Sequence, residues 1–266
     1  MNTSRISVLH VSPHPDDEAI AAPATLLALR DAGHKVTNLL VSLGRPADRR
    51  RRKGEAKRAA KQLGLELLLD KPLGISRADD LDSAQGELAR MVRRRVDRDG
   101  IGLVVGPSPH DGHHGHEVVG RGIRDALGEL GDAAPRWWMW GLWADLPLPT
   151  LYVPFDEKRL RQALKGLDAY RGELDRNDYT ELVRGRAKAN RVLGSERVFG
   201  FGSGAYGELP FAELLTEVVR AGESWHAAAP RALDPADPLP HVEPQGNLGW
   251  WVEGQSFGDR MRAERP

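Results

Sequence analysis

The residues best suited to catalytic chemistry lie in two clusters, and each cluster comes within a few residues after a short apolar run. The first cluster, Pro13-His14-Pro15-Asp16-Asp17-Glu18, follows the apolar run 6–11 and combines an imidazole with carboxylates. The second, 109–117, follows the run 101–105 and contains His110, His113, His114 and His116. Imidazole nitrogens and carboxylate oxygens are common ligands of divalent first-row metals. We therefore predict one metal site that is assembled from both clusters.

Asp16 and Asp17 are adjacent carboxylates, which suits two different roles. One can bind a metal while the other takes a proton from the water that attacks the substrate. The alternative is that both acids merely cap the start of a helix, where free amides and the helix dipole favour negative charge. Capping explains one or two acids, but it does not explain the His14-Pro15 pair that precedes them. A catalytic zinc site typically takes three protein ligands, so the second cluster is needed to complete it.

The elements around the clusters predict an α/β fold. We expect strands at 6–11, 36–43, 65–69 and 101–105, and helices at 18–31, 47–63, 85–96 and 116–130. Because strands and helices alternate with short connections, the expected core is a Rossmann-like parallel sheet with helices on both faces, over residues 5–145. Ligands bind at the carboxyl edge of such a sheet, which is where both clusters would meet.

The second half of the chain is less regular. We expect a strand within 136–143 and helices at 156–170, 178–190 and 210–219. The strand contains four tryptophans, of which most are expected in the core and one at the pocket. We assign residues 1–222 to one domain, in which 146–222 would form a cap over the substrate.

Residues 223–266 are interpreted as a Pro-rich extension. Prolines interrupt any regular element there, namely Pro230, Pro235, Pro238, Pro240 and Pro244. We favour a segment that wraps the surface or is disordered over a functional arm. Trp250 and Trp251 indicate that part of it docks on a protein surface.

Composition excludes several classes of protein. Lysine plus arginine and aspartate plus glutamate both number 38, which argues against a dedicated nucleic-acid binder. The absence of cysteine excludes disulfides and thiolate metal ligands. No apolar run is long enough to span a membrane, and the N-terminus lacks the pattern of a signal peptide, so we expect a cytoplasmic protein. A homo-oligomer is left open.

The two motifs together resemble the PIG-L/LmbE family of zinc-dependent N-acetylglucosaminyl deacetylases, over residues 5–130. That family pairs His-Pro-Asp-Asp-Glu with a later His-x-Asp-His on a Rossmann-like fold. The resemblance implies a zinc ion, or another divalent first-row metal, bound by His14, Asp17 and His116. It implies Asp16 as the general base that deprotonates metal-bound water. His113 would stabilise the oxyanion or protonate the leaving amine.

The implied activity is hydrolysis of an N-acetyl or other N-acyl group from a small molecule that contains an amino sugar. The alternatives are a related amidase that acts on a thiol conjugate or a glycan, and a metal- or sugar-binding protein with weakened catalysis. A nucleotide-binding Rossmann protein is a further alternative.

One position departs from the family pattern. Gly115 stands where the family carries an aspartate before the last histidine, and such partners of metal ligands affect affinity and activity. Asp111, Glu117 and Glu18 are the candidates to replace it.

Substrate contacts are less defined by the sequence. Arg52 matches the position of a substrate-binding arginine in the family, and either Asp79 or Asp80 corresponds to a sugar-binding aspartate. Arg52 belongs to a basic stretch over 45–61, which forms either a solvated helix face or a region that attracts an anionic substrate. The glycines of 202–207 match G-x-G-x-x-G, but their context favours a loop or a pocket rim over a dinucleotide site.

Overall fold

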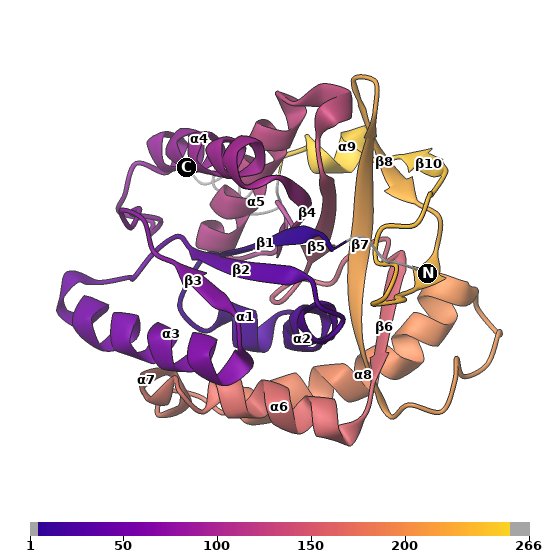
Figure 1. The fold of residues 1–266 in the computed structure, drawn as a ribbon, viewed down its shortest axis with the longest axis horizontal. Helices are drawn as coiled ribbons and strands as arrows, with labels where there is room; N and C mark the ends of the chain where they lie inside the picture. Colours follow the sequence, from indigo (N-terminus) through magenta and orange to yellow (C-terminus); the bar gives the residue numbers. More distant parts are fainter. Residues whose placement is uncertain (1–4, 256–266) are drawn as a thin grey trace, which may run out of the picture.

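A mixed sheet with helices on both faces forms the centre of the computed structural model, which describes residues 5–255 (Figure 1). Within these residues, ten strands join the sheet. Five parallel strands follow the order β3-β2-β1-β4-β5, with the bounds β1 (Ser7–Ser12), β2 (Lys35–Leu40), β3 (Glu66–Leu68), β4 (Ile101–Pro107) and β5 (Arg136–Trp140). The predicted α/β class and the parallel half of the sheet are therefore confirmed.

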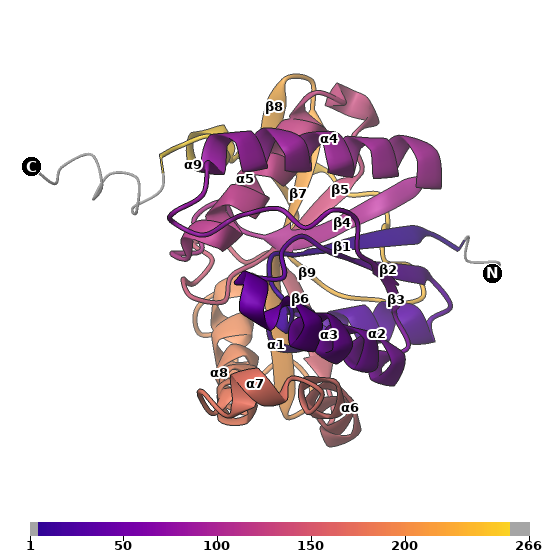
Figure 2. The ribbon, with the colours of Figure 1, turned by 90° about the vertical axis from the view of Figure 1, so that its left-hand side faces the viewer.

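Two hydrophobic cores lie on opposite faces of this sheet. Successive side chains of a strand point to opposite faces, so Val8 belongs to one core and Leu9 to the other. Helices α4 (Leu81–Asp99) and α5 (His114–Gly128) cover one face (Figure 2). The other face is covered by α1 (Asp17–Ile20), α2 (Pro23–Asp31) and α3 (Arg49–Leu63), the last of which follows the 3-10 turn Pro46–Asp48.

The single helix expected over 18–31 is wrong, because the chain forms α1 and α2 with a break at Ala21 and Ala22. Pro23 has no amide hydrogen and would clash with the preceding turn, so it begins a helix instead of continuing one. The break confines α1 to one short turn directly after the first cluster.

The helix expected over 210–219 is also wrong, because this segment is the strand β7 (Phe211–Ala221). It runs antiparallel to β5, to β6 (Leu151–Phe155) and to β8 (Ser224–Ala228). Leucine, alanine and glutamate favour a helix locally, but pairing with three strands overrides that preference. Further helices α6 (Glu157–Leu167), α7 (Arg171–Leu174) and α8 (Tyr179–Phe199) connect β6 to β7, and a 3-10 turn at Gly131–Ala133 precedes β5.

Regular structure continues beyond Ser224, although the prolines of this segment favour an irregular one. β8 extends the sheet, and it is followed by β9 (Arg231–Ala232), β10 (Pro244–Asn247) and α9 (Gly249–Val252). The buried carboxylate of Glu217 on β7 holds this region, since it accepts hydrogen bonds from Arg136 at 3.0 Å and from Arg231 at 2.8 Å. Trp251 packs against the core, whereas Trp250 is exposed. Residues 256–266 of the predicted extension lie outside the described residues, and the division at residue 222 stays a prediction.

Every helix among residues 5–255 is too short or too polar to cross a lipid bilayer.

Candidate metal and active site

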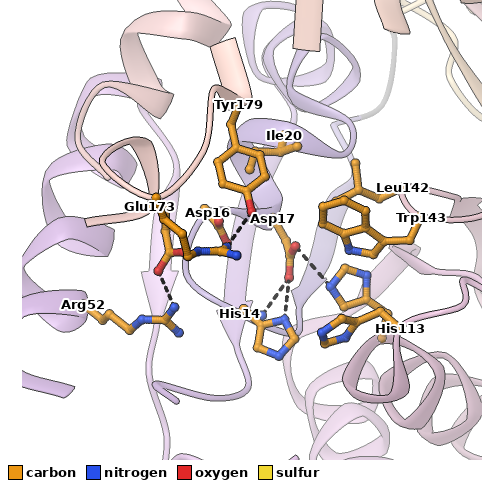
Figure 3. Close-up of a pocket in the computed structure, with 12 residues that line it drawn as sticks. His14, Asp16, Asp17, Ile20, Arg52, His113, Leu142, Trp143, Glu173 and Tyr179 are labelled. Carbon is orange, nitrogen blue, oxygen red and sulfur yellow. Dashed lines mark hydrogen bonds and ion pairs between the residues drawn. The ribbon is translucent and has the colours of Figure 1, made fainter. Parts of the chain in front are cut away.

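Both sequence clusters lie at the carboxyl ends of neighbouring strands, the first after β1 and the second after β4. Side chains from both line one pocket of about 360 Å³. The pocket contains all six residues that the sequence predicts as site residues: His14, Asp16, Asp17, Arg52, His113 and His116 (Figure 3). The predicted convergence of the clusters is therefore present in the structure, whereas their individual roles stay predictions.

Three imidazoles converge in this pocket. One ring nitrogen each from His14, His113 and His116 lies within 4.8 Å of the other two. The ring centroids are 4.7 to 5.2 Å apart. Such spacing leaves room for one metal ion between the nitrogens, since a zinc–nitrogen bond measures about 2.0–2.1 Å.

The Asp17 carboxylate lies between two of these imidazoles. Its Oδ1 is 3.3 Å from Nε2 of His116 and its Oδ2 is 3.4 Å from Nδ1 of His14. Oδ2 also accepts a hydrogen bond from the His14 backbone amide at 2.7 Å. Burial alone would raise the pKa of Asp17, but the two histidines outweigh burial and hold the pKa below its usual range. The carboxylate is thus ionised and oriented towards the imidazole nitrogens.

A second carboxylate, that of Asp111, orients the His116 ring. Its Nδ1 donates to Oδ2 of the fully buried Asp111 at 2.7 Å, so Nε2 faces Asp17. Burial lowers the pKa of His116, but Asp17 and Asp111 together raise it to about 10. Two carboxylates around one imidazole create a negative potential that favours a cation at this position.

Of the three candidates to replace the aspartate missing at position 115, Asp111 makes the contact with His116. Glu117 instead accepts a hydrogen bond from the Gly112 amide, and Glu18 accepts one from the Tyr170 hydroxyl.

Gly115 itself lies against the first cluster. A Cβ atom there would be 2.9 Å from Cε1 and 3.0 Å from Nε2 of His14, closer than side chains pack. The small residue therefore lets the His14 ring lie directly on the first turn of α5.

His113 presents an unsatisfied nitrogen. Its buried Nδ1 has no hydrogen-bond partner among the described residues. Burial and the neighbouring His116 and His14 lower the pKa of His113 to about 3, so its ring is neutral. A neutral imidazole with a free nitrogen suits either a metal or a substrate atom.

Asp16 has a strained backbone. Among residues 5–255 it is the one non-glycine residue with positive φ, at 112°. This conformation turns the chain between Pro15 and α1 and accompanies a carboxylate that lines the pocket. Burial, followed by the charges of Asp17 and Glu173, raises the pKa of Asp16 well above its usual value. A carboxylate of raised basicity is suited to accept a proton.

Comparison with known proteins finds one family model that spans both clusters. The PIG-L family, described as GlcNAc-PI de-N-acetylase, matches residues 9–127, a segment that contains both clusters. We call residues 9–127, which match this family model, the PIG-L segment. No match was found among curated proteins.

Several solved structures share the fold of the PIG-L segment and most of the remaining chain. Teicoplanin deacetylase Orf2, in a zinc-inhibited form, is 16% identical with a TM-score of 0.59, over 82% of this chain and 100% of that one. N,N'-diacetylchitobiose deacetylase from Pyrococcus horikoshii is 16% identical with a TM-score of 0.53, over 79% and 83%. GalB, the 4-carboxy-2-hydroxymuconate hydratase from Pseudomonas putida KT2440, is 18% identical with a TM-score of 0.62, over 81% and 97%. At these identities the likeness concerns the fold, and the fold accommodates more than one reaction.

The far wall of the pocket comes from beyond the PIG-L segment. The residues that form it are Leu142, Trp143, Glu173, Arg176 and Tyr179. The sequence singled out none of them, except that one tryptophan was expected to reach the pocket. Trp143 is that tryptophan, whereas Trp137, Trp138 and Trp140 are buried in β5. In a sequence, polar residues of short helices and turns cannot be distinguished from ordinary surface residues. No local pattern therefore marks the remaining residues of this wall.

Three other sequence candidates lie elsewhere. Asp79 accepts hydrogen bonds from Ser76, and Asp80 caps α4 by accepting from the Ser83 amide. Neither aspartate is among the residues that line the pocket. The glycines of 202–207 occupy an exposed loop between α8 and β7, which agrees with the loop interpretation and not with a pocket rim.

Proposed function

We propose that this protein is a metal-dependent hydrolase that removes an N-acetyl or other N-acyl group from a small molecule containing an amino sugar. The observation that carries the proposal is the convergence of three imidazoles and the Asp17 carboxylate, with Asp16 beside them in the same pocket. The PIG-L match and the deacetylases among the structural neighbours agree with it.

His14, Asp17 and His116 are the residues that we propose to hold the metal. The donor set fits a divalent first-row ion. Zn²⁺ is our choice, because zinc sites in proteins are built from imidazole nitrogens and carboxylate oxygens. The buried, unpartnered Nδ1 of His113 lies beside this set and agrees with the fit. When bound, the metal would polarise the amide carbonyl and make water more acidic.

Asp16 and His113 supply the proton and charge chemistry in this proposal. A carboxylate oxygen of Asp16 takes a proton from the attacking water as the new C–O bond forms. His113 then either stabilises the developing oxyanion or, once it has received the proton that Asp16 took from the water, passes that proton to the nitrogen as the C–N bond breaks. The products are a carboxylic acid and a free amine, so one water is consumed for each amide hydrolysed.

A substrate panel tests the proposal directly. Metal content is measured on the purified chain, and the zinc-loaded protein is incubated with N-acetylglucosamine, its 1- and 6-phosphates, and N,N'-diacetylchitobiose. We expect equal amounts of acetate and primary amine from at least one compound, with activity removed by EDTA and restored by Zn²⁺. Bound metal without acetate release from any of them would instead favour the weakened metal- or sugar-binding protein.

A further inference from the structure

We propose that Arg52, Glu173 and Arg176 form a subsite for an anionic substituent of the substrate, a phosphate or a carboxylate. We call these three residues the Arg–Glu–Arg subsite. The inference rests on the proposed function, because it assigns a substrate class to the same pocket. It adds Arg176, which no sequence motif indicated.

One carboxylate in this subsite serves two guanidinium groups. The buried Glu173, with 4% of its side chain exposed, accepts a hydrogen bond from Arg52 through Oε1. Its Oε2 accepts from Nε and Nη2 of Arg176, at 3.2 and 2.9 Å. Within this subsite two positive charges face one negative charge, and Asp16 is the further carboxylate whose charge acts on both arginines. The guanidinium N–H groups that do not serve Glu173 can donate to an anion of the substrate.

Arg176 is the accessible member. Its side chain is 63% exposed, compared with 19% for Arg52, and both line the pocket. Arg176 also donates to the Tyr179 hydroxyl at 2.5 Å and lies 5.4 Å from the centre of that ring. These contacts hold the guanidinium in place before a ligand arrives, so little side-chain freedom is lost on binding.

Arg52 lies close to the backbone of Gly44. A Cβ atom at Gly44, whose φ is +68°, would lie 2.7 Å from Nη1 of Arg52. The guanidinium therefore passes close over the Gly44 backbone on its way to Glu173. Both arginines line the pocket, and Figure 3 shows Arg52 directed towards Glu173.

An aromatic surface lies near this wall. Trp143 is 48% exposed, and its ring centre is 6.5 Å from that of Tyr179. Flat aromatic faces pack well against sugar rings. The pocket thus contains donors for a metal, an aromatic face and a cationic wall. These match an amide, a sugar ring and an anionic group in one small molecule.

Binding without turnover tests the subsite. The probes are N-acetylglucosamine, its 1- and 6-phosphates and N-acetylmuramic acid, titrated calorimetrically into zinc-loaded Asp16→Asn protein at fixed ionic strength. We expect at least one anionic probe to bind tenfold or more tightly than N-acetylglucosamine. The phosphates and the carboxylate of N-acetylmuramic acid distinguish the two kinds of anion.

Variants assign the preference to the subsite. In Asp16→Asn/Arg176→Gln we expect the anionic advantage to fall below threefold, with zinc content unchanged. Arg176→Lys should retain part of it, because the charge remains while the two-point contact is lost. Lys53→Gln, an exposed cation on α3, is the matched control and should keep the full advantage.

Equal binding of neutral and anionic probes, no binding of any probe, or an advantage that survives Arg176→Gln would each overturn the proposal. A clear anionic preference without acetate release in the wild-type assay would support the subsite and contradict the hydrolase. The two failures are therefore distinguishable.

Discussion

Asp111 connects His116 to the wall of the pocket. One of its oxygens accepts the Nδ1 hydrogen of His116, and the other accepts the backbone amides of Leu142 and Trp143 at 2.5 and 3.1 Å. The same buried carboxylate therefore orients a proposed metal ligand and the segment that carries the aromatic face. Partners of this kind fix which ring nitrogen of a histidine is free to bind a metal.

Asp111→Asn should weaken zinc binding by about 10- to 100-fold. If the asparagine oxygen still accepts hydrogen bonds from the backbone amides of Leu142 and Trp143, the NH₂ group of the side chain faces Nδ1 of His116. The imidazole proton then moves to Nε2, where it blocks zinc binding. Competition with a chromogenic chelator measures the affinity. Asp97→Asn, on the exposed side of α4, is the control. An unchanged affinity in Asp111→Asn would show that this hydrogen bond does not set the ligand geometry.

Asp16→Asn and Asp17→Asn should separate catalysis from metal binding. Asp16→Asn should keep its zinc and lose turnover by about 10²- to 10⁴-fold, the usual contribution of a general base. Asparagine tolerates the positive φ of this position, so the fold should be retained. Asp17→Asn should lose the metal. Elemental analysis and acetate release measure both variants, and loss of zinc from Asp16→Asn would contradict the proposed roles.

His113→Ala decides between two interpretations of the three imidazoles. If His113 acts on the substrate, the variant keeps close to one zinc per chain and loses activity. If His113 is a ligand, zinc affinity falls as it does in His116→Ala. We expect the first result, and zinc titrations of the two variants side by side provide the comparison.

Gly115→Ala should also weaken zinc binding, because the added methyl group would displace the His14 ring. Gly115→Asp, which restores the residue typical of the family, should be no better in this chain for the same reason. Gly185→Ala is the matched control, since that helical glycine has nothing within 4 Å of an added Cβ. The control should be neutral or stabilising by up to about 1 kcal/mol. Full zinc affinity in Gly115→Ala would mean that His14 can move at no cost.

Glu213 should make the protein less stable as the pH rises from about 4.5 to 7. Its buried carboxyl accepts hydrogen bonds from Ala24 and Thr25 at the start of α2, but burial dominates and raises its pKa to about 7. Within this window the unfolded chain has released the proton while the folded chain retains it. The free energy of unfolding therefore falls with rising pH, by at most about 1.4 kcal/mol per pH unit from this group.

Urea unfolding of wild type and Glu213→Gln at several pH values isolates this effect, because all other groups are shared. The stability of the wild type relative to the variant should decline across the window and level off above about pH 7. A relative stability that instead grows with pH would show that the start of α2 favours the ionised carboxylate.

The parallel half of the sheet and the residues of the candidate site can be predicted from local patterns in the chain. Apolar runs end a few residues before His14 and before the histidines of the second cluster, and parallel strands present their carboxyl ends at one edge. The metal-binding chemistry belongs to the residue types themselves. These signals are local in the chain, so they could be predicted without knowledge of long-range contacts.

The residues that complete the pocket and the fold of the second half depend instead on contacts between remote segments. Residues 211–221 have helix-forming composition but pair as β7 with strands that are distant in sequence, and Glu213 and Glu217 are buried there with partners from α2, β5 and β9. Glu173, Arg176 and Tyr179 reach the pocket because α7 and α8 lie beside it, and Asp111 is distinguished from Glu117 and Glu18 only by its contact with His116. Such choices depend on pairing and burial between remote segments, whose free energies outweigh local propensity and leave no pattern in the sequence.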